Sequence, residues 1–134
     1  MEIFVSWIIS EKYSKMMGRV SIFIDSIRKS SYYQHANTDT LIFIPVLVDG
    51  EAYELAPDLK VSKMRSPSPG VLIQFRINTE KWLLLENDER LKYTYECFVL
   101  AVKGYASIKK RPDFDLNLVF DIIDNAFDAA KIVS

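Results

Sequence analysis

Thr40–Asn78, with the sequence TLIFIPVLVDGEAYELAPDLKVSKMRSPSPGVLIQFRIN, is the stretch that decides the fold. It predicts two β-hairpins in tandem, because runs rich in β-branched and aromatic residues alternate with turn residues. In the first hairpin, Leu41–Val48 turns back through Asp49-Gly50 into Glu51–Ala56. Aspartate and glycine both tolerate the positive φ angles of a two-residue turn, so this pair is a strong hairpin signal.

The second hairpin joins Leu59–Arg65 to Val71–Asn78 through a tip at Ser66–Gly70. Its last strand alternates apolar and polar residues, which predicts one face on a core and one face largely in water. The apolar positions are Val71, Ile73, Phe75 and Ile77. In the first hairpin, Pro45 has no backbone N–H, so that side of the strand is expected to face an edge or a bulge.

The residues before the hairpins predict a strand and a helix. Glu2–Ile9 carries apolar residues on both faces, as in a strand interior to a sheet. Ser10 suits a helix N-cap, and apolar residues then follow helical spacing from Tyr13 to Ile27. A strand over Arg19–Asp25 is the rival interpretation. We favour the helix because seven apolar positions share one stripe.

The residues after the hairpins predict three helices. Thr79–Glu86 forms a short one, a longer one begins at Asn87 or Asp88, and the last is capped by Asp113 or Asp115. The resulting order, β-α-ββββ-ααα, is typical of an α+β domain. We expect a mostly antiparallel sheet of about five strands with helices packed on one face. No linker divides residues 1–134, so a single domain is expected.

Composition and charge exclude several classes of protein. The net charge is −1, which is not that of a general nucleic-acid binder. The one cysteine cannot form an internal disulfide, and the apolar start is too short for a membrane span. A cytoplasmic protein with no membrane partner is expected. The basic residues of the second hairpin lack the interleaved aromatics of a stacking platform, so no direct nucleic-acid binding is predicted; they are Lys60, Lys63, Arg65 and Arg76.

Residues for catalysis are scarce. His35 and Cys97 are the single histidine and the single cysteine, and together they cannot supply four zinc ligands. No calcium-loop pattern and no glycine-rich phosphate loop is present. The sequence therefore predicts no enzyme, no metal and no cofactor. One alternative is a small enzyme or ligand-binding domain whose pocket has Tyr32, Tyr33, His35 and Cys97 at its mouth.

The last predicted helix carries an acidic stripe. Asn117, Asp121, Asp124 and Asp128 recur at i, i+4, i+7 and i+11, which places them on one helix face opposite the apolar one. Such charge is ordinarily a solvated surface. The functional interpretation is an acidic face that docks on a basic partner. The candidate partner-binding residues are Asp113, Asp115, Asn117, Asp121, Asp124 and Asp128.

This profile resembles the immunity proteins of bacterial polymorphic-toxin and contact-dependent growth inhibition systems. The resemblance rests on the acidic helix Asp113–Lys131 and on the hairpin tips at Asp49-Gly50 and Ser66–Gly70. It implies a cytoplasmic protein that binds one cognate toxin domain, often a nuclease, and blocks its active site. The partner it implies has a basic surface. A third hypothesis is a structural subunit that forms a weak homodimer through the Pro45 strand or another sheet edge.

Overall fold

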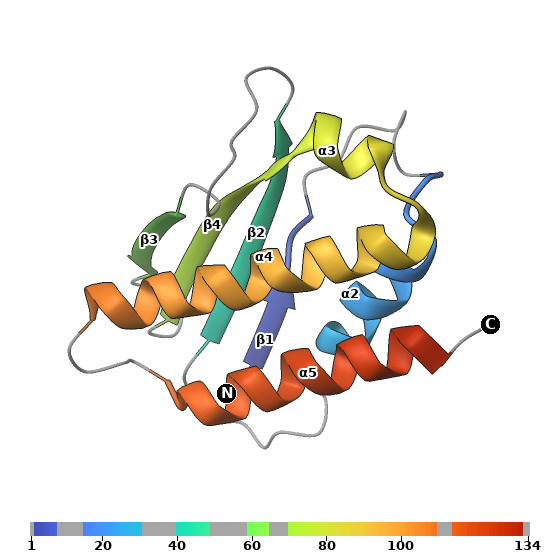
Figure 1. The fold of residues 1–134 in the computed structure, drawn as a ribbon. Helices are drawn as coiled ribbons and strands as arrows, with labels where there is room; N and C mark the ends of the chain where they lie inside the picture. Colours follow the sequence, from blue (N-terminus) through green and yellow to red (C-terminus); the bar gives the residue numbers. More distant parts are fainter. Residues whose placement is uncertain are drawn as a thin grey trace.

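The chain forms an α+β fold in a computed structural model that describes residues 2–7, 15–30, 40–48, 59–64, 70–109 and 114–132 (Figure 1). Four strands form one mixed sheet, and helices lie against it. Within the described ranges, none of the helices combines the length and the apolar character that a bilayer crossing needs. In chain order the elements are β1 (Glu2–Val5), α2 (Arg19–Ser30), β2 (Thr40–Val48), β3 (Leu59–Met64), β4 (Gly70–Asn78), α3 (Thr79–Leu84), α4 (Asn87–Ile108) and α5 (Leu116–Ile132).

The sheet has the strand order β1-β2-β4-β3, and the expectation of a mostly antiparallel sheet is wrong. β2 pairs in parallel with β1 and also with β4, from Thr40↔Gly70 to Val48↔Asn78. Only β3 and β4 are antiparallel, which confirms the second hairpin. β4 lies between β2 and β3, so these two strands, which follow each other among the described elements, are not neighbours in the sheet. The proposed fifth strand, Glu51–Ala56, and its Asp49-Gly50 turn lie outside the described residues.

Pro45 shows how a proline is accommodated in a central strand. Pro45 is buried, and it pairs with Phe75 of β4. The amide of Ser6 donates to the carbonyl of Phe43 at 2.8 Å, so the backbone groups of Phe43 face β1. Alternate residues of a strand point their backbone groups to the same side, and the nitrogen of Pro45 therefore faces the β1 side as well. The described pairing with β1 ends at Val5↔Phe43, so no hydrogen bond of this pairing needs the N–H that Pro45 lacks.

Residues 15–18 are not helical, so the described part of the helix that the sequence predicts begins at Arg19. Of the two interpretations of Arg19–Asp25, helix is confirmed and strand is wrong. Gly18 adopts a φ of 50°, a left-handed conformation that interrupts any helix arriving from the N-terminal side. The side-chain oxygen of Asn87 accepts from the Arg19 amide at 3.1 Å, so α4 supplies the cap of α2. Ser10 and Tyr13 lie outside the described residues.

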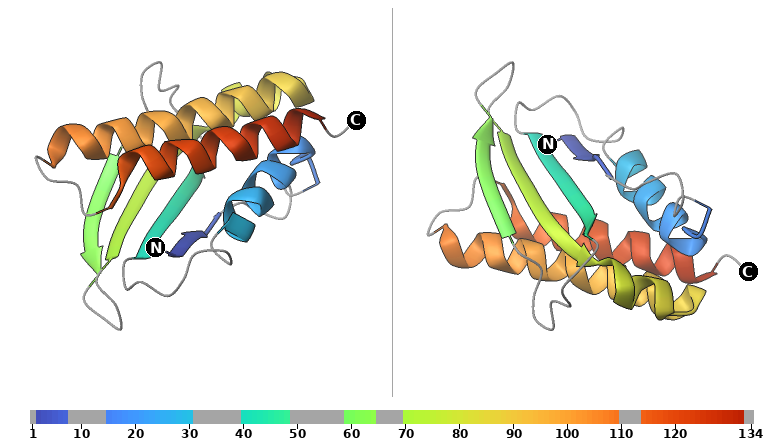
Figure 2. Two further views of the ribbon diagram at one scale, coloured as in Figure 1. Left: turned by 90° about the horizontal axis from the view of Figure 1, so that it is seen from below. Right: turned by 90° about the horizontal axis from the view of Figure 1, so that it is seen from above.

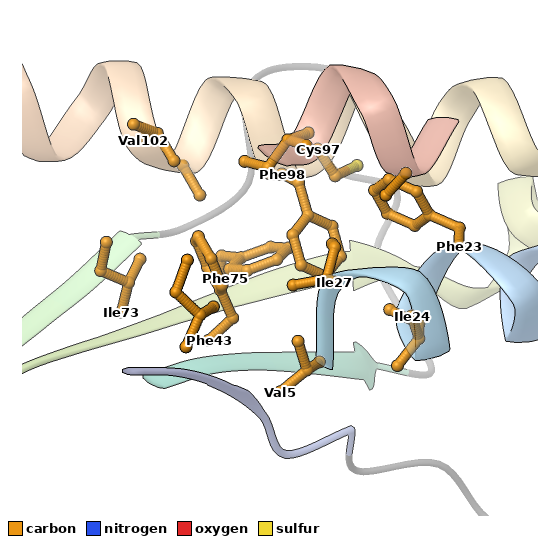
Figure 3. Packing of buried hydrophobic residues seen from close by; sticks show 14 of the residues in the cluster. Val5, Phe23, Ile24, Ile27, Phe43, Ile73, Phe75, Cys97, Phe98 and Val102 are labelled. Atoms are coloured by element: carbon orange, nitrogen blue, oxygen red, sulfur yellow. The ribbon is translucent and has the colours of Figure 1, made fainter. Parts of the chain in front are cut away.

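The core lies between the sheet and its helices, as Figure 2 shows from two sides. Odd-numbered side chains of β1 and β4 are buried, as are Leu41 and Phe43 of β2, whereas Phe4 on the opposite face is 46% exposed. Phe98 of α4 is at the centre of the aromatic packing (Figure 3). Its ring centroid lies 5.0 Å from that of Phe75, 5.1 Å from Phe43 and 5.2 Å from Phe23. These contacts join α4 to two strands and to α2.

Arg90 is a buried arginine that joins three segments of backbone. Its Nε donates to the carbonyl of Trp82 at 2.8 Å, and its Nη1 donates to Met16 at 2.7 Å. Its Nη2 donates to Leu85 at 2.8 Å and to Leu83 at 3.3 Å. The guanidinium also lies 4.5 Å from the centre of the Trp82 ring. Carbonyls at the end of α3, which lack partners within the helix, are satisfied in this way.

Candidate partner-binding surface

The predicted acidic stripe is exposed on α5. Asn117, Asp121, Asp124 and Asp128 all lie on the solvent side of the helix, and we call these four residues the α5 acidic face. The opposite side packs into the core, with the buried residues Val119, Ile122, Ile123, Ala126 and Ala130. The spacing argument is therefore confirmed as geometry. Among the described residues 114–132 there are four aspartates and one lysine.

The two other candidates have different positions. Asp115 is exposed and precedes α5, where its Oδ1 accepts from the amide of Leu118 at 3.2 Å. It therefore serves as the N-cap, one of the two alternatives that the sequence left open. Asp113 lies outside the described residues, as do the hairpin-tip residues 65–69.

Asp124 is tied to the neighbouring helix through Tyr95. The Tyr95 hydroxyl donates to the Oδ1 of Asp124 at 2.6 Å. The Tyr95 ring stacks on Phe127 of α5, with centroids 4.2 Å apart and planes 18° apart. Tyr95 itself is half-buried. An oriented aromatic ring therefore borders the α5 acidic face.

Apolar spacing alone places Tyr95 on the inward side of α4 and does not reveal this role. The buried side of α4 is instead turned toward Thr94, Cys97 and Ala101, which leaves Tyr95 and Val99 at the border with α5. The sequence gives one sign of a surface role for Tyr95, its place at the edge of the apolar stripe. A tyrosine ring in that position keeps its hydroxyl near water. Nothing in the spacing connects Tyr95 to an aspartate 29 positions away.

The acidic residues around Tyr95 raise the pKa of its hydroxyl. The hydrogen bond to Asp124 is the largest cause that raises the pKa of Tyr95 to about 12, followed by burial. The charges of Asp124, Asp128 and Glu96 raise the pKa further, because they disfavour a phenolate. Glu96 of α4 therefore extends the negative field beyond α5.

We expect Asp124→Asn to lower the pKa of Tyr95 from about 12 toward the ordinary value of 10.0. The substitution removes both the charged acceptor and one of the surrounding charges. NMR titration of the ring carbon that bears the hydroxyl measures this pKa directly. Tyr93, whose pKa is raised to about 12 by burial first of all, is the internal control and keeps its value. An unchanged Tyr95 titration contradicts the assignment of Asp124 as the main cause.

Cations near the α5 acidic face already have partners. Lys131 lies 3.2 Å from Asp128, and its Nζ also lies 4.5 Å from the centre of the Phe127 ring. Arg19 forms an ion pair with Asp88 at 2.6 Å and donates to the carbonyl of Lys131 at 3.5 Å. These contacts bring the beginnings of α2 and α4 to the end of α5, as Figure 1 shows.

The alternative site, a pocket with a histidine and a cysteine, is not assembled among the described residues. Tyr32, Tyr33 and His35 lie outside them. Cys97 is buried, 3% exposed, and Figure 3 shows it among the core side chains. Burial is the largest cause that raises the pKa of its thiol to about 12, so it carries almost no thiolate at neutral pH. In the described part of the chain, no cluster of three or more histidine, cysteine or acidic residues suits a metal ion.

Cys97 is expected to resist thiol reagents in the folded protein. A buried thiol with a raised pKa lacks both access and nucleophilic character. At pH 8, Ellman's reagent should leave Cys97 unmodified in the native protein and react with one equivalent in denaturant. Rapid modification of the native protein contradicts the buried position and reopens a nucleophilic role.

Comparison with known proteins adds no relative. No protein-family model, no curated protein and no solved structure matches this chain. The functional argument therefore rests on the surface itself.

Proposed function

We propose that this chain is an immunity protein that binds one cognate bacterial toxin domain and blocks its active site. The observation that carries the proposal is the α5 acidic face, bordered by the oriented ring of Tyr95. The protein works by binding, with no enzyme activity and no cofactor of its own. It acts in the cytoplasm, where an incoming toxin meets its target.

The chemistry of the face suits a basic partner. Enzymes that act on nucleic acids use lysine and arginine to hold phosphates, and carboxylates compete for those groups. Asp121, Asp124 and Asp128 present three carboxylates along one helix face. Complementary charge increases the rate of association and selects among partners. The proposed partner is therefore a toxin domain with a basic surface, and a nuclease fits this description.

The rigidity of α5 favours tight binding. The helix packs on both α2 and α4, and Val119, Ile123 and Ala130 are fully buried. Its carboxylates are thus presented on a fixed backbone, which limits the entropy lost on association. Tyr95 adds a half-buried aromatic side chain held by Asp124 and Phe127. Tyrosines in such settings are enriched among the residues that dominate binding energy.

Capture followed by a growth assay tests the proposal. The tagged protein is used to capture partners from a lysate of its source cell, and each stoichiometric partner is identified by mass spectrometry. The captured domain is then expressed in a bacterial host, alone and together with this protein. We expect growth arrest by the domain alone and normal growth on co-expression.

A captured partner that does not inhibit growth contradicts the immunity function. A partner whose toxicity persists on co-expression contradicts it as well. If a small molecule is retained in place of a protein, the ligand-binding alternative around His35 gains support instead.

A further inference from the structure

Leu84 is the most exposed large apolar side chain in the described part of the chain. It is 86% exposed, compared with 60% for Ile108 and 42% for Leu100. It is the last residue of α3, two positions after Trp82, which is fully buried. A single exposed leucine is common on protein surfaces and needs no explanation by itself. The surroundings of Leu84 are what distinguish it.

The backbone on both sides of Leu84 is held by a buried cation. Arg90 donates to the carbonyls of Leu83 and Leu85, the residues before and after it. A leucine exposed on a loose turn loses conformational entropy when it is buried in an interface. Leu84 instead projects from a turn whose carbonyls are fixed. Its side chain is therefore pre-organised for burial against a partner.

The backbone of Met16 is held by the same cation. Its carbonyl accepts from Nη1 of Arg90 at 2.7 Å, and its residue is 39% exposed. Carbonyls from residues 16, 83 and 85 thus meet at one guanidinium. Two exposed apolar residues from distant parts of the sequence therefore have their backbones held at the same buried cation. We call Leu84 and Met16 the apolar tip.

The rim of the apolar tip is acidic. Glu80, Glu86, Asp88 and Glu89 are all exposed. Of the cations near these residues, Arg90 is buried, Lys81 lies over the Tyr93 ring at 4.6 Å, and Lys15, which precedes Met16, is exposed. An apolar centre with a negative rim fits an apolar pocket bordered by lysine or arginine. Asp88 also contacts Arg19, which donates to the carbonyl of Lys131 at the end of α5.

We infer that the apolar tip inserts Leu84 into a basic-rimmed apolar pocket of the toxin domain, an inference that rests on the proposed function. The α5 acidic face, which lies on the other side of α4 (Figure 1), supplies further complementary charge. The partner is thereby specified further, since it must offer an apolar depression next to its basic groups. An interface of this form has an apolar centre and a charged periphery, which is the usual arrangement of stable complexes.

Substitutions at Leu84 test this inference with the captured toxin domain as the probe. Affinity is measured by calorimetry for the wild type, Leu84→Asp, Leu84→Ala and the control Ile108→Asp, which changes an exposed apolar residue at the other end of α4. We expect Leu84→Asp to weaken binding by about 30-fold or more and Leu84→Ala by about tenfold. Ile108→Asp should stay within about threefold of the wild type.

The negative charge introduced by Leu84→Asp makes the affinity measurement easier to interpret. A basic rim attracts an added carboxylate, so a loss of affinity in Leu84→Asp reports lost apolar contact and not repulsion. Because Leu84 is 86% exposed, its variants should keep the wild-type melting temperature. Leu84→Ala adds no charge and provides the second reading if Leu84→Asp changes the fold.

The outcomes separate this inference from the proposed function. Full affinity in both Leu84 variants, for a captured domain that this protein neutralises, overturns the apolar tip and leaves the immunity function standing. A captured domain that is not toxic overturns the proposed function, and the toxin-pocket inference with it. Equal losses at Leu84 and Ile108 also overturn the inference, because they show no preference for the tip.

Discussion

Replacing Arg90 with methionine is expected to lower the free energy of unfolding by about 3–5 kcal/mol. Arg90 is 8% exposed, and its guanidinium donates to four backbone carbonyls, at 2.7 to 3.3 Å. Methionine fills a similar space but donates no hydrogen bond. The carbonyls of Trp82, Leu83, Leu85 and Met16 are then left without this donor in a region with little access to water.

The size of this loss of stability follows from the backbone carbonyls that remain buried when the guanidinium is removed. A buried ion pair can be replaced by apolar residues at little cost, because both charges disappear together. Here the partners are backbone carbonyls, which no side-chain substitution removes. A hydrogen bond to a charged group contributes about 1.5–3 kcal/mol, and the four contacts share one desolvated cation, so their sum is not additive. The expected loss of unfolding free energy is therefore smaller than the sum for four separate hydrogen bonds. It is still large for a single substitution.

Urea denaturation measures the loss, with Lys92→Met as the matched control. Lys92 is exposed on the same helix, so its replacement should change stability by less than about 0.5 kcal/mol. Arg90→Lys should fall between the wild type and Arg90→Met, because an ammonium group has fewer donors and no planar fork. If Arg90→Met is as stable as Lys92→Met, the guanidinium does not hold this end of the fold.

The parts of the fold that sequence predicts are those set by local pattern. Alternation of apolar and polar residues over Ile73–Asn78 identifies β4, and a turn-rich tip identifies its antiparallel partner β3. Apolar spacing correctly favours helix over strand at Arg19–Asp25. Each of these features depends on residues close together in the chain, where periodicity is informative.

The parts that sequence does not predict depend on distant contacts. The parallel pairing of β2 with β4 leaves no mark in β2, because a continuous apolar run suits either a hairpin or a central parallel strand. The start of α2 is capped by Asn87, which lies 68 residues from Arg19 in the chain. In the sequence, Arg90 looks like any charged residue of a helix, and only the tertiary structure shows that it is buried.

The candidate surface divides in the same way. Helical spacing is sufficient to place Asn117, Asp121, Asp124 and Asp128 on one face, and the structure confirms that they are exposed. Tyr95 joins the surface through a hydrogen bond between helices, and Leu84 through a turn held by Arg90. Neither has a local signal, since an exposed leucine and a buried one look alike in a sequence. Interfaces are thus only partly readable before the fold is known.

Reversing three charges on the α5 acidic face is expected to weaken toxin binding by about 100-fold or more, which is about 2.7 kcal/mol. The variant combines Asp121→Lys, Asp124→Lys and Asp128→Lys. Each replaced carboxylate removes an attraction and adds a repulsion toward a basic partner. Because charge also steers association, the variant should associate more slowly than the wild type at low salt, and the two association rates should converge at high salt.

The fold should survive these changes, because the three carboxylates make only exposed contacts. Asp128 loses an exposed ion pair with Lys131, and such pairs contribute about 0–1 kcal/mol. Asp124 loses the hydroxyl of Tyr95, whose stacking on Phe127 remains. Far-UV circular dichroism and thermal melting verify that the variant is folded before its affinity is measured.

Two controls isolate the charge of this face from charge in general. Asp25→Lys reverses an exposed carboxylate on α2 that pairs with Arg28 within its own helix. It should leave the affinity within about threefold of the wild type. Asn117→Ala alters the same face without changing its charge, and its effect should be similarly small. Unchanged affinity in the folded triple variant removes α5 from the interface, and the apolar tip around Leu84 then has to account for binding alone.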